Sequence, residues 1–324
     1  MVRSLLVLPT MLAMYLPFCA VQHVRPTTHP SGLPVASLWT APTDLADRDL
    51  FYGPWGPERA PDPAATYTLV AIKRTGVNPG MTVKDPQGRE WSVKQAATDE
   101  RPDEGPVEVV LSRVLSAVGY YQPPVYYLPA FTLQDDWGRH VEPGGRFRLK
   151  VSSLKDRGTW SFQQNPFVGT DPYEGLLVIL MMFNSSDLKN TNNVLYEYSS
   201  GGPRQYWYVV RDLGTALGTT GRFVPEKNNA EAFERHGFLN GVRNGFVEFA
   251  YAGFHQEIVR DRITPEHVRW ASDLLGSLEE RQWQEAFMAG GYRPALAARF
   301  IRVLQQKIAD GKALPRQRAA DAGR

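Results

Sequence analysis

Two short polar segments in the middle of the chain carry residue types that could do chemistry together. The first, N-S-S-D-L-K-N-T-N-N, places Asp187, Lys189 and Asn192 in a D-x-K-x-x-N spacing, and the second, V-V-R-D-L-G, holds Asp212 just past an apolar strand. A carboxylate can accept the proton of an attacking hydroxyl, and an amide oxygen with a second carboxylate can bind the divalent metals that bridge phosphates. Together these residues could support phosphoryl transfer from a nucleotide.

The elements around these segments are expected to bring their side chains together. Residues 172–183 read as a continuous apolar helix with a proline in its first turn, and this helix ends where the first segment begins. Residues 194–198 and 206–211 are predicted to form a hairpin about a G-G-P turn. Because a hairpin returns its ends to one place, Asn192 and Asp212 are expected at the same edge.

Taken singly, each of these polar residues has a commoner structural role. Asp187 could be a helix cap or an Asx turn, Asn192 and Asn193 could be turn residues, and Asp212 could be an acid at a strand end. The prediction therefore depends on the set and its order in the chain. Asn193 takes the place of Asn192 if the loop is one residue longer.

The region before the apolar helix is predicted to supply a sheet and a further helix. Residues 66–75, 81–84 and 89–95 read as an antiparallel meander joined by the turns G-V-N-P-G and D-P-Q-G. Residues 107–118 show apolar positions at helical spacing and end at a glycine cap. P-P-V-Y-Y-L is a fourth strand, and F-R-L-K-V, after the turn signals D-D-W-G and E-P-G-G, closes this part of the chain.

In this order of elements, and in the motifs D-L-K-x-x-N and D-L-G, the chain resembles the protein-kinase-like superfamily. Leu213 stands where the family usually has Phe, Ser185 and Ser186 stand where it often has His-Arg, and no A-P-E follows. The resemblance covers residues 65–300 and is to divergent members, such as the HipA-like and secretory-pathway kinases.

The resemblance implies a fold, cofactors and roles. The fold is α+β with two lobes: a small antiparallel-sheet N-lobe at residues 65–150 and a mainly helical C-lobe at 151–310. The cofactors are ATP and Mg²⁺ or Mn²⁺. Proton acceptance falls to Asp187, with Lys189 beside it for phosphate neutralisation, and metal binding falls to Asn192 and Asp212.

Two lysines compete for the position that holds the α- and β-phosphates. Lys73 lies in V-A-I-K, a protein-kinase signature, but it precedes the glycine loop, whereas the family places this lysine after the loop. Lys94, in W-S-V-K on the third strand, is therefore preferred. Glu108, in the first turn of the following helix, would pair with Lys94, and Glu104 in the preceding loop is the reserve. A solvated strand lysine and an acid favoured by the helix dipole are the simpler alternatives.

The loop between the first two strands is poor in glycine. It has Gly76 and Gly80 with Pro79 between them, where the family has G-x-G-x-x-G. Fewer glycines leave fewer backbone N–H groups to bind phosphate. This feature, and the shortage of ATP in the periplasm, favour an alternative function: a catalytically silent kinase-like module that binds or scaffolds in the cell envelope.

The first 20 residues differ from the rest. They hold Arg3 and an apolar run that Pro9 and Pro17 interrupt. This run is too short and too interrupted to span a membrane, and it predicts a secretory signal peptide. A buried strand or helix is the alternative. Cys19, the only cysteine, lies where a lipoprotein signal carries its lipid, and it leaves no partner for an internal disulfide. We expect an exported protein, periplasmic or bound to the cell envelope, that contacts membrane only through such an anchor.

Residues 21–64 and 311–324 are predicted to lie outside the catalytic unit. The first stretch is rich in Pro, Thr, Gly and Ala and reads as a tether whose aromatic residues pack onto the domain surface; the second reads as a solvated tail. His236, His255 and His267 have no metal-ligand spacing, so a zinc site is not expected.

Composition bounds the remaining function classes. The 324 residues, 43% hydrophobic and 22% charged, suffice for two lobes with a sizeable core. A net charge of +2 with interleaved acids and bases argues against a nucleic-acid groove, and the lack of G-x-S-x-G argues against a serine hydrolase. The prediction is an exported, ATP- and metal-dependent phosphotransferase that acts on a protein or a small hydroxylated molecule. Nucleotidyl transfer by the same residues is a variant.

Overall fold

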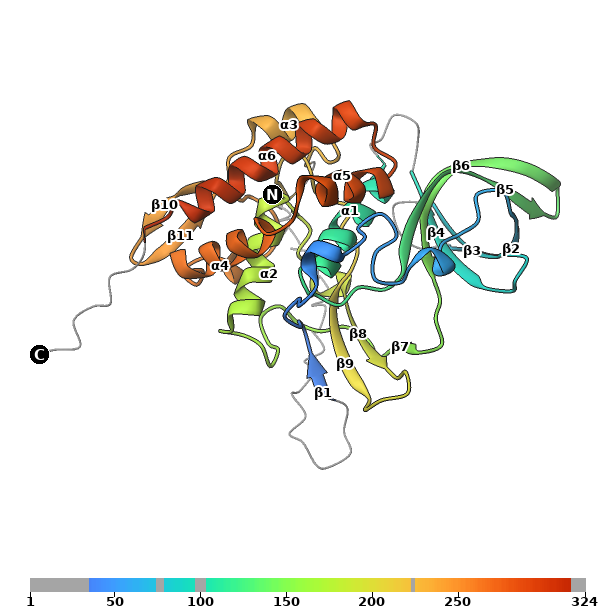
Figure 1. Cartoon of the computed structure of the whole chain (residues 1–324), viewed down its shortest axis with the longest axis horizontal. Coiled ribbons are helices and arrows are strands. Elements are labelled where there is room, and N and C mark those ends of the chain that lie inside the picture. The colour runs from blue at the N-terminus through green and yellow to red at the C-terminus, as the bar shows by residue number, and fades with distance from the viewer. Residues whose placement is uncertain (1–34, 74–78, 97–102, 223–224, 316–324) are drawn as a thin grey trace, which may run out of the picture.

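A closed five-stranded barrel forms from the strands on either side of the first long helix (Figure 1). The computed structural model describes residues 35–73, 79–96, 103–222 and 225–315. Strands β2, β3 and β4 are antiparallel neighbours, which confirms the predicted meander. Strand β6 pairs with β4 and β5, and parallel pairing of β2 with β5 closes the barrel. The strands are Thr66–Lys73 (β2), Gly80–Lys84 (β3), Glu90–Gln95 (β4), Val125–Asp135 (β5) and Gly138–Leu149 (β6).

Aromatic side chains fill the barrel. Tyr67, Trp91, Phe131 and Phe147 are buried inside it and come from four of its strands. The rings of Phe131 and Phe147 meet edge to face with centroids 5.1 Å apart, and Trp91 lies 6.0 Å from Phe147. Successive side chains of a strand point to opposite faces, so the apolar residues of each strand point into the barrel.

One predicted turn is wrong. The E-P-G-G segment is not a turn but lies inside β6, where Pro143 pairs with Ala130 and Gly145 pairs with Leu128. A Cβ on Gly144 would lie 2.5 Å from the carbonyl oxygens of Leu128 and Pro129, so this glycine lets the two strands approach closely. The turn signal D-D-W-G, between β5 and β6, is confirmed.

Helix α1 (Glu104–Ala117) begins three residues before its predicted start. The side chain of Asp103 caps it by accepting a hydrogen bond from the Gly105 backbone N–H. Glu104, expected in the preceding loop, is therefore the first helical residue, and Glu108 lies in the second turn rather than the first. Nearly every residue of α1 is buried, because it packs against both the barrel and the helices.

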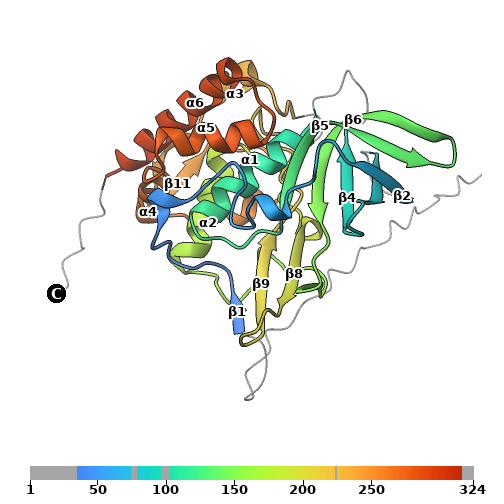
Figure 2. The same cartoon turned by 45° about the vertical axis from the view of Figure 1, so that its right-hand side comes forward.

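A four-stranded sheet with the order β1-β9-β8-β7 lies beside the barrel, and β7 follows closely after β6 (Figure 2). The predicted hairpin is confirmed as β8 and β9, with Asn193 paired to Val210. The apolar helix before it is confirmed as α2 (Asp171–Met182). The strands are Val35–Ser37 (β1), Leu154–Asp156 (β7), Asn193–Tyr198 (β8) and Gln205–Val210 (β9).

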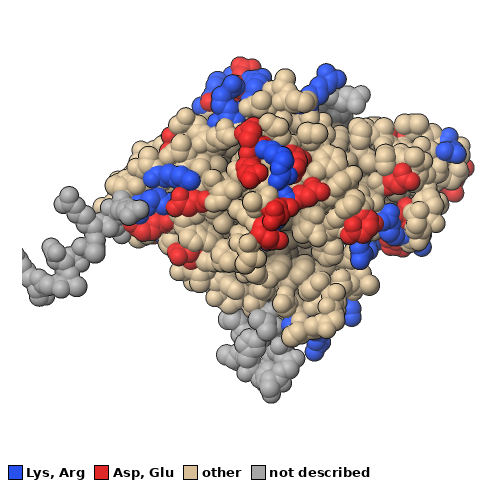
Figure 3. All heavy atoms as spheres, viewed as in Figure 1, with Lys and Arg blue, Asp and Glu red and all other residues tan. Residues whose placement is uncertain are grey.

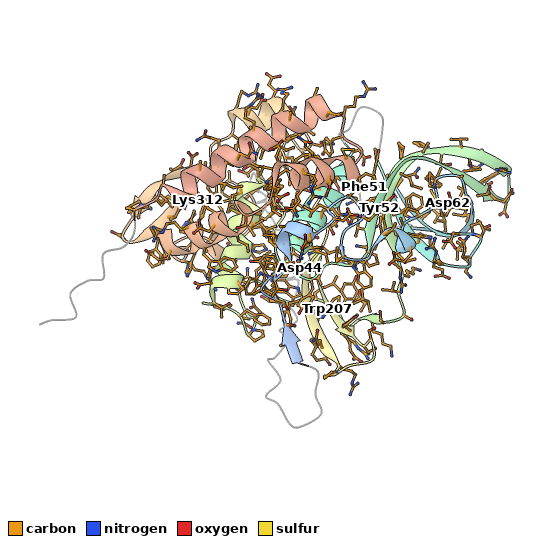
Figure 4. The ribbon with its side chains drawn as sticks, viewed as in Figure 1. Asp44, Phe51, Tyr52, Asp62, Trp207 and Lys312 are labelled. Atoms are coloured by element: carbon orange, nitrogen blue, oxygen red, sulfur yellow. The ribbon has the colours of Figure 1, made fainter. Side chains whose placement is uncertain are left out.

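The described part of the predicted tether packs onto the rest of the chain. Its strand β1 pairs in parallel with β9, and the segment that follows crosses α1 (Figure 1). Leu38 and Leu50 are buried, and the indole N–H of Trp39 donates to the Val118 carbonyl at 2.7 Å. Figure 4 shows Phe51 from this segment near α1, where its carbonyl accepts from Arg113.

Helices cover the far side of α2 and complete the larger core, together with a hairpin of β10 and β11. The sequence from residue 246 onward predicts helices, and this is confirmed from residue 265 onward, although β11 and a 3-10 turn precede those helices. These elements are α3 (Ala230–Arg235), β10 (Leu239–Arg243), β11 (Phe246–Phe249), α4 (Pro265–Leu275), α5 (Glu280–Ala289) and α6 (Pro294–Lys312). The fold is thus α+β, as predicted.

The predicted signal peptide, with Cys19, lies outside the described residues, as does the tail from residue 316. Of the helices within the described ranges, none has the length and apolar character needed to cross a bilayer. Figure 3 shows acids and bases interspersed on the face that it presents, with no large patch of one sign.

Candidate active site

Lys94 stands at the centre of an ion cluster that joins three elements. Its Nζ lies 2.6 Å from Oδ1 of Asp212, 2.7 Å from Oε2 of Glu104 and 3.9 Å from Oε2 of Glu108. Burial alone would lower the pKa of Lys94, but these carboxylates outweigh it and raise the pKa above its ordinary value. The lysine therefore carries its positive charge at any physiological pH.

The two acids on α1, Glu104 and Glu108, make their closest contacts with different cations. Glu104, the reserve partner, is the closer to Lys94, and its other oxygen accepts from Lys227. Glu108, the preferred partner, is turned toward Arg146, whose Nε lies 3.0 Å from its Oε1. Burial would raise the pKa of Glu104, but Lys94 and Lys227 lower it overall. The structure thus brings both acids to Lys94 and places Glu104 in direct contact.

Asp212 reaches the cluster from the end of β9. The backbone N–H of Arg211 donates to the Asn192 carbonyl at 3.1 Å, so the mouth of the hairpin holds both predicted segments together. Asp212 has a left-handed φ of 60°, which Asp tolerates better than most residues, and its side chain is half exposed. Burial would raise its pKa, but the charge and hydrogen bond of Lys94 lower it overall.

The glycine of the D-L-G motif is required by close packing. A Cβ on Gly214 would lie 2.4 Å from the Cβ of Glu104 and 3.0 Å from its carbonyl oxygen. Leu213, where the kinase-like family usually has Phe, is buried in the larger core. The segment after Asp212 therefore packs directly against the first turn of α1.

The loop between α2 and β8 holds Asp187 through local contacts. The amide of Asn192 donates to the Asp187 carbonyl at 2.9 Å, and the ammonium of Lys189 lies 2.9 Å from Oδ1 of Asp187. The Ser186 N–H donates to the Thr215 carbonyl at 3.0 Å, which ties this loop to the segment after Asp212. Asp187 is partly exposed and remains accessible from solvent.

No family model and no curated protein matches the sequence. The solved structures that match include a Helicobacter pylori proinflammatory kinase, CtkA, at TM-score 0.37, with 78% of this chain and 100% of that chain covered. Rio2 kinase from Chaetomium thermophilum, in a complex with ADP, Mg²⁺ and phosphoaspartate, matches at TM-score 0.29 over 75% and 72%. A Leishmania major MAP kinase, LmaMPK10, matches at 0.19 over 77% and 82%.

These three structures are all kinases, and each matches at 12% sequence identity and a TM-score below 0.5, so neither a family nor an activity of this chain follows from them.

The remaining residues considered for the site in the sequence analysis lie outside the ion cluster or outside the described residues. Gly80 pairs with Lys94 between β3 and β4, and Gly76 lies outside the described residues. Lys73, the rejected lysine, is not part of the ion cluster; its Nζ donates to the Ser92 hydroxyl at 3.1 Å. Asn193, the reserve for Asn192, is fully buried and donates to the Trp160 carbonyl.

Asn192 and Asp212 have the chemistry of a partial metal site. Within the described ranges, no group of three or more His, Cys, Asp or Glu side chains is arranged to hold a metal. The Asn192 amide nitrogen is engaged with Asp187, which makes its oxygen the atom that could bind a cation, and the Asp212 carboxylate is half exposed. Two oxygen ligands fit Mg²⁺ in a site completed by water and phosphate oxygens.

Lys307 is a residue of the site region that the sequence analysis missed. From α6 it donates to the Met182 carbonyl at 2.9 Å and to Oδ1 of Asn184 at 2.8 Å, at the start of the Asp187 loop. Asn184 has a left-handed φ of 55° and donates to the Gly218 carbonyl. Burial lowers the pKa of Lys307 to about 7. Residues 294–310 have apolar residues on one face at helical spacing, and a lysine on that face is the signal that could have identified it.

Proposed function

We propose that the chain is a two-lobed, kinase-like phosphotransferase that uses a nucleotide and a divalent metal. The observation that carries this proposal is the contact of Lys94, on the third strand of the barrel, with Asp212 beyond the hairpin and Glu104 on α1. Asp212 lies 118 residues from Lys94 in the sequence, and the three residues come from β4, α1 and the segment after β9. A largely buried lysine between acids is a costly arrangement, which makes a functional site the natural hypothesis.

Each residue has a role in this proposal. Lys94 binds and neutralises phosphate oxygens, and Glu104 and Glu108 hold its ammonium in place. Asp187 accepts the proton of the acceptor hydroxyl, and Lys189, whose ammonium lies 2.9 Å from Oδ1 of Asp187, holds this carboxylate and adds positive charge for the phosphate. The amide of Asn192 holds the backbone carbonyl of Asp187. Asn192 and Asp212 would hold Mg²⁺ or Mn²⁺, which neutralises phosphate charge when bound.

The proposal also includes the substrates and the cellular location. The donor is ATP, and the acceptor is a hydroxyl of a protein or a small molecule. The reaction would take place in the periplasm or at the cell envelope, reached through the predicted signal peptide, with Cys19 as a possible lipid site. Nucleotidyl transfer uses the same residues and is separated from phosphoryl transfer by the mass added to the acceptor.

A second candidate function is supported by the same ion cluster. The Lys94 ammonium lies 2.6 Å from Asp212, so it already neutralises the carboxylate that would bind the metal. A stable ion pair at this position suits a catalytically silent module that binds or scaffolds in the cell envelope. The two functions differ in whether the nucleotide and the metal bind here.

A thermal-shift titration separates them. ATP with Mg²⁺ or Mn²⁺ should raise the melting temperature of the wild-type chain, since a ligand at about 100 times its dissociation constant adds about 2.7 kcal/mol to stability. Lys94→Ala and Asp212→Ala should abolish the shift, and Lys84→Ala, at an exposed ion pair with Glu90, should keep it. No shift with any nucleotide and metal would leave the silent module as the better proposal.

A rate measurement then tests the chemistry. Asp187→Asn should lower the rate of phosphate release or transfer from ATP by ~10²- to 10⁴-fold, because it removes the proton acceptor. Binding of ATP and metal in the thermal-shift assay should persist. An unchanged rate in Asp187→Asn would contradict the role of this residue.

A further inference from the structure

A cavity of about 440 Å³ lies between the barrel and the four-stranded sheet. Strands β2, β3, β4 and β6 contribute side chains from the barrel, and β7, β8 and the residue after β9 contribute from the sheet. The cavity adjoins the ion cluster: Ser92 lies two residues before Lys94 on β4, and Arg211 directly precedes Asp212. Residues two apart on a strand share one face.

The lining of this cavity is cationic. Lys73, Arg148, Lys150 and Arg211 line it, and Asp156 is its only acidic lining residue among the described ranges. The hydroxyls of Thr82, Ser92 and Tyr196 add further polar groups. Ligand pockets are usually lined mainly by apolar and aromatic side chains with a few polar ones. The apolar residues Pro123, Leu149, Val151 and Leu154 of this cavity fit that pattern, and the excess of cations over acids is what departs from it.

Two of the four cations have a carboxylate of their own. Lys150 lies 3.1 Å from Glu90, and Arg211 lies 3.8 Å from Asp156 while donating to the Tyr196 hydroxyl.

Of the other two cations, Lys73 has no ion pair with a carboxylate among the described residues, and Arg148 shares its carboxylate with Arg146. Lys73 contacts the neutral Ser92 hydroxyl. Arg148, whose side chain is only 14% exposed, has its nearest acid in Glu108 at 3.8 Å, and that acid is engaged at 3.0 Å by Arg146. The lining of the cavity therefore carries more positive than negative charge.

Burial and the neighbouring positive charges lower the pKa values of Lys73 and Arg148. Burial, followed by repulsion from Arg148, Arg146 and Arg211, lowers the pKa of Lys73 to about 8. Burial, followed by repulsion from Arg146 and Arg211, lowers the pKa of Arg148 to about 10. A bound anion would relieve this repulsion.

We propose that this cavity is an anion subsite that binds a phosphate group, with Arg148, Arg211 and Lys73 as its ligands. Guanidinium groups match the paired oxygens of phosphate, and an ammonium adds a point charge. The phosphate comes either from a nucleotide or from another phosphorylated compound, since both offer the same anionic group. The proposal also gives a role to the V-A-I-K lysine that the proposed catalytic cluster leaves out. The subsite deepens the proposed function, but it requires only anion binding and no turnover.

Calorimetric titration of the full chain with inorganic pyrophosphate, ADP and adenosine, each without metal, tests the subsite. Pyrophosphate and ADP should bind, adenosine should not, and added salt should weaken the binding. Arg148→Gln, Arg211→Gln and Lys73→Gln should each weaken pyrophosphate binding at least tenfold. Lys155→Ala removes the same charge from an exposed position on β7 outside the cavity and should leave the binding unchanged.

The outcomes divide clearly. Tighter binding of adenosine than of pyrophosphate, or pyrophosphate binding that survives the Arg211→Gln and Lys73→Gln substitutions, overturns the subsite. If Arg148→Gln fails to fold, these two variants carry the test, because Lys73 and Arg211 each keep part of their surface in solvent. Pyrophosphate binding that depends on these residues, together with no metal-dependent ATP shift, would retain the subsite and reject the proposed phosphotransferase.

The source of the phosphate follows from the comparison of ADP with pyrophosphate. ADP binding stronger than pyrophosphate binding assigns the phosphate to a nucleotide. Equal binding assigns it to a wider class of phosphorylated compounds.

Discussion

At the scale of single residues, the chemistry is concentrated in one lysine and the acids that hold it. Lys94 contacts Asp212 and Glu104 from two different elements, and both carboxylates have pKa values below their ordinary range because of it. The cluster is therefore held together by charge rather than by apolar packing. Its strength should depend on pH.

Lys94→Met should destabilise the chain by about 1–3 kcal/mol at pH 7, since it leaves partly buried carboxylates without their cation. A lowered carboxyl pKa contributes stability above the unfolded-state pKa and loses it as pH falls through the folded-state pKa. The deficit should therefore shrink below about pH 4. Urea denaturation at pH 7 and pH 3.5 checks this, with Lys84→Met as the exposed control. A deficit that does not change with pH would contradict the ion-cluster account.

At the scale of elements, two close contacts set the position of the segments that carry the predicted site residues. Gly214 fits the segment after Asp212 against the first turn of α1. Lys307 fixes the end of α2 from α6. Neither residue is placed in the proposed chemistry, so each should act through position.

Gly214→Ala should destabilise the chain by about 1–3 kcal/mol, because its Cβ would overlap Glu104 and move α1. It should also weaken any ATP-dependent thermal shift through loss of the Lys94–Glu104 contact. Gly202→Ala is the matched control, since no heavy atom lies within 4 Å of a Cβ there. Equal stability of the two variants in guanidinium denaturation would show that the close approach does not constrain the fold.

Lys307 should make stability rise with pH. Its folded-state pKa is about 7, below the ordinary value of 10.5, so the unfolded chain binds more protons between these values. Stability should therefore increase with pH in this window, by up to about 1.4 kcal/mol per pH unit. Lys307→Met should flatten the profile measured by denaturation between pH 7 and pH 9.5. A slope equal to the wild-type slope would assign the pH dependence to another group.

At the scale of the whole molecule, the segment before the barrel is part of the folded structure. Strand β1 extends the sheet beside β9, whose Trp207 Figure 4 labels, and Trp39 packs on Trp270 with centroids 5.4 Å apart. Leu38 and Leu50 belong to the larger core. A flexible tether would have none of these contacts.

A chain that begins at Ala65 should consequently be less stable than one that begins at Val35. Removing two buried leucines and their packing should cost several kcal/mol, at ~2–5 kcal/mol for each fully buried leucine truncated to alanine. Thermal denaturation of the two chains provides the measurement. Equal melting temperatures would support the tether that the sequence predicts.

Much of the fold was predictable because it depends on local patterns. Turn residues and period-two alternation located the meander and the β8–β9 hairpin, and an unbroken apolar run located α2. Hairpin geometry also predicted that the ends of β8 and β9 would meet, and the Arg211 N–H lies 3.1 Å from the Asn192 carbonyl. The roles of Asp187, Asn192 and Asp212 stay predictions that the proposed experiments test.

Other features depended on pairings that no local pattern encodes. The sequence by itself placed Lys94 on the correct strand, but the earlier start of α1 decided that Glu104 makes the direct contact. E-P-G-G has turn composition, yet strand pairing with β5 makes it part of β6. The cationic cavity required β2, β6 and β9 to be brought together across more than 130 residues. Side chains so distant in sequence meet only through tertiary packing, because burial and close contact act through space rather than along the chain.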